Sequence, residues 1–225
     1  MTKIIKIAHR GFSNIQLENT LEAFNNAIKY KFDMIELDVR LCKYNQLVIY
    51  HDSYIKKNNK IFFIKDLSYE ELLNINPNII TLPIFFQHID KSKIKINIDI
   101  KGDSKIIKYI LEYLNNTFLN FDNIILTSFN LNIIQEINNF NKNNPYKYIN
   151  KGFITENRFD LITLDILLKD IEFLIINWNN LSEEIINYCH KNDKKILCYT
   201  CKNSDEYNYI KLFNIDGIIT DIYLI

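Results

Sequence analysis

Three acidic residues lie in two short segments whose pattern would bring them together. In residues 34–40, polar and apolar residues alternate with a period of two, so Glu36 and Asp38 point to one side of a predicted strand. Residues 97–101 alternate in the same way and place Asp99 on one face. Crowded carboxylates repel each other unless a cation compensates them, and oxygen ligands suit Mg²⁺ or Ca²⁺. We therefore predict that these three acids bind one divalent cation; the alternative is a solvated edge strand with exposed acids.

Two histidines and two basic residues occur at the ends of similar segments. His9 and Arg10 end the first predicted strand, and His51 ends a later, shorter one. Two imidazoles can supply a base and an acid on opposite sides of a phosphoryl group, while Arg10 and Lys101 can hold its charge. A single histidine is more often structural, and Asp99 beside Lys101 could be only a neutralising pair. Their joint occurrence at strand ends favours phosphodiester cleavage, with a small molecule as substrate.

The composition argues against several other classes of protein. The 225 residues have a formal net charge of zero, which gives no attraction to nucleic acid or to an anionic membrane. No segment has the ~18 consecutive apolar residues of a transmembrane helix, and the first eight residues do not form a signal peptide. Cys198 and Cys201 form a lone C-x-x-C across a strand end, so we predict ordinary thiols and a cytoplasmic protein. No P-loop occurs, and the oligomeric state stays open.

Short apolar segments alternate with amphipathic ones along the whole chain. Eight strands are predicted at 3–9, 33–40, 95–101, 123–128, 148–154, 173–178, 195–200 and 217–221. Helices are predicted at 20–31, 83–91, 104–118, 131–141, 160–170, 182–192 and 203–214. This order predicts an α/β fold, a closed (β/α)8 TIM barrel; a doubly wound sheet is the alternative.

Two features depart from a regular repeat of strand and helix. An insertion of about 44–82 follows the second strand and contains His51 and a small helix near 68–75. The chain stops directly after the eighth strand, so the last helix is expected to be missing or vestigial. Asn19, with Glu22 three residues later, is predicted to cap the first helix. Without any linker or repeat, residues 1–225 are expected to form a single domain.

These residues also resemble a known family. Four pieces occur in the order and approximate spacing of the glycerophosphodiester phosphodiesterases: His9-Arg10-Gly11, Glu18-Asn19-Thr20, residues 35–39 and His51-Asp52. Later pieces that are similar to the family are Leu82-Pro83, Asp99-Ile100-Lys101, Thr127-Ser128-Phe129, Tyr199-Thr200 and the segment from Asp216 to Asp221. The resemblance therefore covers nearly the whole chain.

The resemblance implies an enzyme that hydrolyses glycerophosphodiesters to glycerol 3-phosphate and an alcohol. It implies His9 and His51 as the acid/base pair, Arg10 and Lys101 on the phosphate, and Mg²⁺ or Ca²⁺ on the three acids. Asp99 departs from the family, which usually has Glu there. Sphingomyelinase D-like phospholipases use Asp at this position, so a lysophospholipase D or sphingomyelinase D-like activity on a phospholipid is one alternative. A barrel that binds phosphodiesters without cleaving them is the other.

Overall fold

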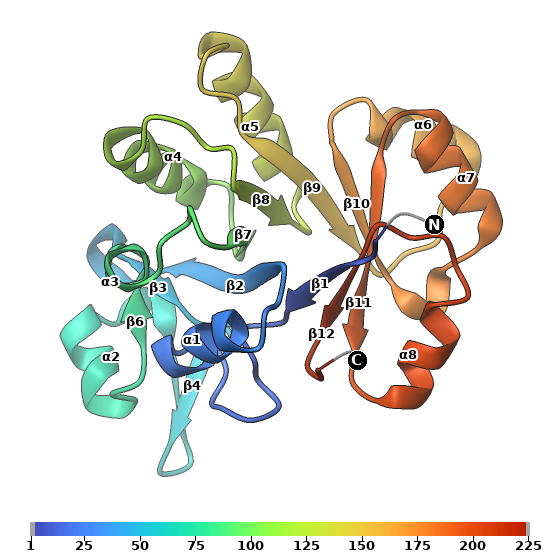
Figure 1. Cartoon of the computed structure of the whole chain (residues 1–225). Coiled ribbons are helices and arrows are strands. Elements are labelled where there is room, and N and C mark those ends of the chain that lie inside the picture. The colour runs from blue at the N-terminus through green and yellow to red at the C-terminus, as the bar shows by residue number, and fades with distance from the viewer. Residues whose placement is uncertain (1–2, 224–225) are drawn as a thin grey trace.

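In the computed structural model, which describes residues 3–223, eight parallel strands close into a barrel (Figure 1). Strand β1 pairs with β2 on one side and with β12 on the other, and this last pairing closes the ring. The barrel strands are β1 (Ile5–Ala8), β2 (Met34–Leu41), β7 (Lys95–Ile100), β8 (Ile124–Ser128), β9 (Asn150–Thr155), β10 (Phe173–Asn177), β11 (Lys195–Cys201) and β12 (Gly217–Thr220). The predicted (β/α)8 barrel is thus confirmed, and an open doubly wound sheet is excluded.

Helices follow the barrel strands and cover the outside of the ring (Figure 1). They are α1 (Leu21–Lys29), α3 (Leu82–His88), α4 (Lys105–Thr117), α5 (Leu131–Asn143), α6 (Leu161–Leu168), α7 (Glu183–Lys191) and α8 (Ser204–Ile210). Among the described residues, no helix follows β12, as the sequence predicted. None of the helices within residues 3–223 has both the length and the apolar character needed to cross a bilayer.

The start of α1 corrects one prediction. The N-cap is Thr20, whose Oγ1 accepts a hydrogen bond from the backbone N–H of Ala23 at 3.3 Å. Asn19, the predicted cap, has a left-handed backbone with φ of 58° and turns its side chain to Asp38 instead. The pattern Asn-x-x-Glu suggested a capping box one residue too early, because the amide of Asn19 is used in the interior of the barrel mouth.

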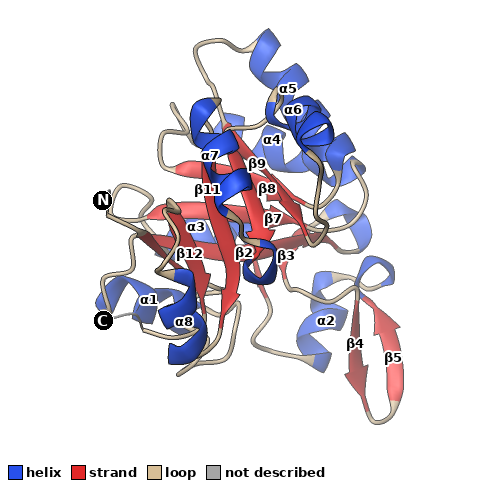
Figure 2. Ribbon diagram, turned by 90° about the vertical axis from the view of Figure 1, so that its right-hand side faces the viewer, coloured by secondary structure: helices blue, strands red, loops and turns tan. Residues whose placement is uncertain are grey.

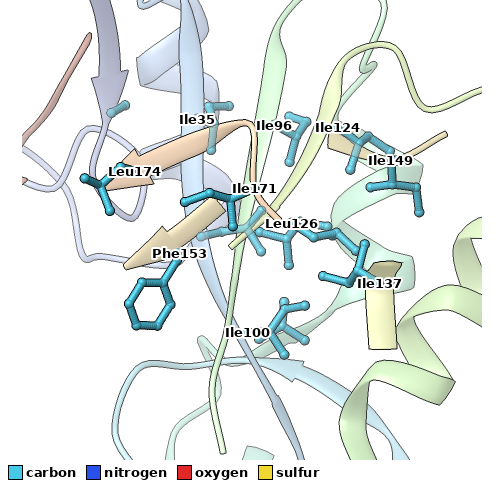
Figure 3. Packing of buried hydrophobic residues seen from close by; sticks show 14 of the residues in the cluster. Ile35, Ile96, Ile100, Ile124, Leu126, Ile137, Ile149, Phe153, Ile171 and Leu174 are labelled. Carbon is cyan, nitrogen blue, oxygen red and sulfur yellow. The ribbon is translucent and has the colours of Figure 1, made fainter. Parts of the chain in front are cut away.

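Strand alternation divides the side chains of the barrel between two environments. Outward residues such as Ile35, Ile96 and Leu126 pack against the helices in the main core, where Ile137 of α5 also lies (Figure 3). Inward residues form a second apolar cluster inside the ring, which includes Met34. Along the inward face of β2 this apolar residue is followed by Glu36 and then Asp38. The inside of the barrel is therefore apolar at the start of the strands and acidic towards their C-terminal ends.

The predicted insertion is a small subdomain joined to the barrel through β2. Strand β3 (Leu47–Ile49) runs antiparallel to the end of β2, with Val39 opposite Ile49, and β6 (Ile80–Thr81) pairs with β3. The hairpin of β4 (Tyr54–Lys57) and β5 (Lys60–Phe63) projects away from the barrel (Figure 2), and helix α2 spans Tyr69–Ile75. The insertion has its own apolar cluster, made of Cys42, Val48, Ile55, Ile64, Leu72 and Ile79.

Candidate active site

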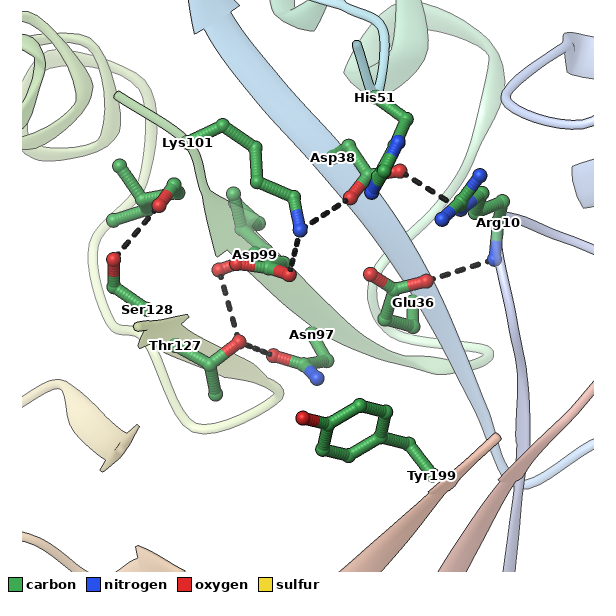
Figure 4. A network of polar contacts seen from close by, with 12 residues as sticks. Arg10, Glu36, Asp38, His51, Asn97, Asp99, Lys101, Thr127, Ser128 and Tyr199 are labelled. Carbon is green, nitrogen blue, oxygen red and sulfur yellow. Dashed lines mark hydrogen bonds and ion pairs between the residues drawn. The ribbon is translucent and has the colours of Figure 1, made fainter. Parts of the chain in front are cut away.

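The three predicted metal ligands meet at the C-terminal end of the barrel. Glu36 and Asp38 lie on β2, and Asp99 lies directly opposite Asp38 on the neighbouring strand β7. All three side chains are buried, and a carboxylate oxygen from each lies within 4.8 Å of the others (Figure 4). This span matches direct coordination of one cation at oxygen distances of about 2.3–2.6 Å. Asp99 therefore reaches the other two acids in spite of its shorter side chain.

Two cationic side chains hold Asp38 from opposite sides. Lys101 Nζ lies 3.2 Å from Asp38 Oδ1 and 2.6 Å from Asp99 Oδ2. Arg10 Nε lies 3.2 Å from Asp38 Oδ2. Burial alone would raise the pKa of Asp38, but the charges of Lys101 and Arg10 outweigh burial and lower this pKa below its usual value. Asp38 is therefore the carboxylate of the three that stays ionised most easily.

In the other two acids, burial outweighs the charges that compensate it. Burial, followed by the repulsion of Asp38, raises the pKa of Glu36 to about 8. Burial also raises the pKa of Asp99, to about 6, although Lys101 acts in the opposite direction. Asp99 Oδ1 is buried without a hydrogen-bond partner in the described part of the chain. Three carboxylates against two cations leave a deficit of positive charge, so the donor set fits a hard divalent cation.

His9 is held at the point where the barrel closes. Its backbone N–H donates to the carbonyl of Thr220, and its Nδ1 lies 2.6 Å from Asp221 Oδ1, just after β12. The hydroxyl of Ser13 donates to the same carboxylate oxygen at 3.0 Å. Burial lowers the pKa of His9, but the hydrogen bond with Asp221 and the charge of Glu36 reverse this effect and raise the net pKa. Asp221 thus fixes the orientation of the ring and favours its charged form.

The turn after His9 places Arg10 over the acids. Arg10 and Gly11 both have left-handed backbones, with φ of 55° and 82°. A Cβ on Gly11 would meet Ala23 of α1 at 2.7 Å, so this close approach needs glycine. The backbone N–H of Arg10 donates to Glu36 Oε2 at 2.8 Å, and its Nη1 donates to both carboxylate oxygens of Glu18 at 2.9 Å. The turn thereby fixes both the main chain and the guanidinium of Arg10.

His51 enters the site from the insertion, as predicted. The antiparallel pairing of β3 with β2 returns the chain to the barrel mouth, where the ring of His51 lines the central pocket. Its Nδ1 lies 2.8 Å from Asp52 Oδ1, and its carbonyl accepts a hydrogen bond from Arg40 Nε at 2.7 Å. Burial lowers the pKa of His51 below its usual value. His51 is thus the more easily deprotonated of the two histidines.

All seven predicted site residues line one pocket of about 180 Å³ inside the barrel mouth. Figure 4 shows the three acids of this pocket with Arg10, His51 and Lys101. The sequence assigned no role to several others that lie there or support it. Asn19 donates to Asp38 Oδ2 at 2.8 Å, and Tyr199, whose hydroxyl donates to the carbonyl of Thr155, forms part of the wall. Phe129 lies under Lys101, with Nζ 5.2 Å from the ring centroid. The family-like pieces around residues 19, 129, 199 and 221 were the signal for them.

Comparison with known proteins gives a consistent result. The sequence model of the glycerophosphoryl diester phosphodiesterase family matches residues 9–223. A glycerophosphodiester phosphodiesterase of Caldanaerobacter subterraneus subsp. tengcongensis is 30% identical, covering 97% of this chain and 94% of that protein. The crystal structure of a glycerophosphodiester phosphodiesterase from Thermotoga maritima is 28% identical, with a TM-score of 0.81 over 98% of this chain and 96% of that chain.

A third similarity concerns the fold alone. A phosphodiesterase of Oleispira antarctica, solved in complex with the product sn-glycerol-3-phosphate, has a TM-score of 0.84 at 20% identity. It covers 97% of this chain and 92% of that chain. The fold is therefore found in a protein of quite different sequence.

Proposed function

Since this chain belongs to the glycerophosphoryl diester phosphodiesterase family, we propose that it hydrolyses glycerophosphodiesters to glycerol 3-phosphate and an alcohol. The observation that carries the proposal is the meeting of both histidines, three carboxylates and two cations in one pocket. The complex of the Oleispira antarctica phosphodiesterase with sn-glycerol-3-phosphate supports the same product. We further propose that Glu36, Asp38 and Asp99 hold one Mg²⁺ or Ca²⁺ ion.

Charge decides how the substrate would bind. The bound cation would polarise phosphoryl oxygens and lower the pKa of the attacking water. Arg10 and Lys101 flank the same acids and would hold the remaining negative charge of the phosphodiester. Within residues 3–223, Arg10 Nη2 makes no hydrogen bond, so it can donate to a phosphoryl oxygen.

The two histidines would then move the protons. One imidazole takes a proton from the attacking water, whose oxygen forms the new bond to phosphorus, while the other gives a proton to the alcohol oxygen as its bond to phosphorus breaks. The two rings come from opposite parts of the pocket wall, His9 from the end of β1 and His51 from the insertion. Asp221 and Asp52 accept from the Nδ1 atoms, which leaves each Nε2 for the reaction.

An assay of glycerol 3-phosphate release from glycerophosphocholine tests the proposal. We expect turnover with Mg²⁺ or Ca²⁺, and loss of turnover in EDTA and in Asp38→Asn. His9→Ala and His51→Ala should each lower kcat by about 10²–10⁴, the usual contribution of one acid/base group. Full activity in the chelator would contradict the metal site, and near-normal turnover of His51→Ala would remove the insertion from the active site.

The same assay separates the alternative substrate. Lysophosphatidylcholine differs from glycerophosphocholine by one acyl chain, so the ratio of the two kcat/KM values distinguishes a lysophospholipase D from an enzyme of water-soluble diesters. A protein that binds either compound yet cleaves neither with Mg²⁺, Ca²⁺ or Mn²⁺ would be the non-catalytic barrel.

A further inference from the structure

A second cavity, of about 660 Å³, lies between the insertion and the start of α4. Its lining comes from the end of β2, from β5 and the residues after it, and from the first two turns of α4. The charged residues that line it are Arg40, Lys65, Lys101, Asp103, Lys105 and Lys108. Five of these six are basic, and we call the cavity the basic groove.

The cations of the groove have few counter-charges. Within the described residues, the ammonium groups of Lys65 and Lys105 make no ion pair or hydrogen bond, and Lys108 only lies 5.9 Å from the ring centroid of Tyr109. The one carboxylate, Asp103, accepts from the backbone N–H of Lys105. The whole chain has no net charge, so this excess is local. Lys101 is already paired with Asp38 and Asp99, so the unpaired lysines of the groove, among the residues that the structure describes, are Lys65, Lys105 and Lys108. Unpaired cations gathered in a concave surface attract an anionic ligand.

The basic groove adjoins the active site, because Lys101 lines both cavities and Arg40 contacts a residue of the site. Lys101 lines both cavities and holds Asp38 and Asp99 from the side of the groove. Arg40 lines the groove and donates its Nε to the carbonyl of His51. Lys101 therefore borders a barrel pocket of about 180 Å³ on one side and a groove of about 660 Å³ on the other.

We propose that the basic groove binds the leaving alcohol of the substrate and selects alcohols that carry a phosphate group of their own. This proposal rests on the proposed function, because it places the scissile phosphate between Arg10 and Lys101. The three-carbon glycerol unit occupies the barrel pocket, and the second phosphate lies among Lys65, Lys105 and Lys108. A cationic alcohol such as choline is disfavoured by the same charges.

Two substrates that differ by one phosphate test this directly. They are glycerophosphoglycerol and the same diester with a phosphate on the terminal hydroxyl of its second glycerol. We expect the wild-type kcat/KM to be about 3- to 10-fold higher for the phosphorylated compound, as two or three solvent-accessible ion pairs would give. The preference should lie mainly in KM and should shrink when the salt concentration is raised to about 0.5 M, because salt screens exposed charges.

Matched variants locate the effect. The double variant Lys105→Ala/Lys108→Ala should bring the ratio of the two kcat/KM values to within about twofold. Lys105→Arg/Lys108→Arg, which keeps both charges, should retain the preference. Lys142→Ala/Lys191→Ala removes two exposed lysines from helices α5 and α7, which do not line the groove, and should leave both substrates unaffected.

The outcomes separate this proposal from the proposed function. Hydrolysis of both compounds at equal rates, or a preference that survives in Lys105→Ala/Lys108→Ala, would overturn the role of the groove and leave the phosphodiesterase activity standing. Inorganic phosphate that slows cleavage of glycerophosphoglycerol without competing with it would show a separate anion site and would also contradict the proposal. Cleavage of glycerophosphocholine but of neither glycerophosphoglycerol compound would overturn the groove's role alone, and failure to cleave any of the three would remove the proposed function as well.

Discussion

Asp38 makes more polar contacts than either of its acidic neighbours. Its carboxylate is within reach of Lys101, Arg10 and the amide of Asn19, and its backbone N–H donates to Asn19 Oδ1 at 3.3 Å. These partners keep its pKa low while that of Glu36 is raised to about 8. Two acids on one strand therefore differ in charge: Asp38 ionises readily, while ionisation of Glu36 at neutral pH is disfavoured.

The side chain of Asp99 is one methylene shorter than that of Glu, and lengthening it tests how well it fits the site. Asp99 already reaches the other acids and Lys101, so Asp99→Glu adds a methylene to a filled position. A displacement of about 1 Å in the reacting geometry can cost about 10²-fold in rate, and we expect a loss of that size together with weaker metal binding. Metal titration and turnover of both proteins on one substrate provide the measurement. Tighter metal binding with equal or faster turnover would show instead that Glu restores a better ligand.

Asp221 gives a second prediction, which concerns pH. In Asp221→Asn the carboxylate that raises the pKa of His9 is lost while burial still lowers it, so the pKa of His9 must fall. The limb of the pH profile of kcat/KM that reports His9 should move to lower pH, and kcat should drop by about 10². Ser13→Ala, which removes only the hydroxyl bonded to the same oxygen, is the control and should leave that limb in place. A loss of activity without a shift would mean that Asp221 acts only in folding.

At the start of α1, two neighbouring residues have different roles: Thr20 caps the helix, and Asn19 contacts Asp38. Thr20→Ala removes the N-cap and should lower the free energy of unfolding by about 1 kcal/mol while metal affinity stays unchanged. Asn19→Gly tolerates the left-handed backbone but deletes the amide that orients Asp38. We expect metal affinity to fall about 10- to 100-fold in this variant, the usual effect of losing a partner of a ligand. Calorimetric metal titration and urea unfolding of both variants are the measurements. Weaker metal binding in Thr20→Ala, or unchanged metal binding in Asn19→Gly, would contradict this assignment.

Elements with a clear period were predictable from the sequence, and so were the residues they carry. Period-two alternation in β2 and β7 was sufficient to place Glu36, Asp38 and Asp99 on the inside of the ring. Nothing local indicates that Asn19 turns away from the helix it precedes, or that Asp221 pairs with His9 212 residues away. Such contacts depend on how distant segments meet when the barrel closes, and the pattern of one segment does not predict this.

The buried acids make the stability of the whole fold depend on pH and on metal binding. Glu36 has a folded-state pKa of about 8 against 4.5 for the ordinary group, and Asp99 about 6 against 3.8. A raised pKa of an acid stabilises the folded state below the ordinary value, and this contribution is lost as pH rises through the folded value. His9, whose pKa is raised, acts in the same direction, while His51, whose pKa is lowered, opposes it.

We therefore expect the metal-free protein to lose thermal stability between about pH 5 and pH 8. Mg²⁺ or Ca²⁺ should raise Tm more at pH 8 than at pH 5, because the cation binds ionised carboxylates. Thermal melting in EDTA and in excess metal at both pH values is the measurement. Glu36→Gln is the matched variant, and its Tm without metal should vary less with pH than that of the wild type. If Tm depends on pH equally in both proteins, groups other than Glu36 cause the effect.

The contact of His9 with Asp221 requires a closed barrel, which has a consequence for refolding. The ring of β-strands closes only when β1 pairs with β12, and that same step brings the two residues within 2.6 Å. Because this pairing joins residues far apart in the sequence and must overcome a loop-closure cost, we expect it to form late in folding. In a refolding experiment we expect the proposed metal binding by residues of β2 and β7 to return before β1 pairs with β12, and the proposed hydrolysis to return only after it. The rate at which activity recovers would then measure the rate at which β12 pairs with β1, without relying on a spectroscopic signal from the helices.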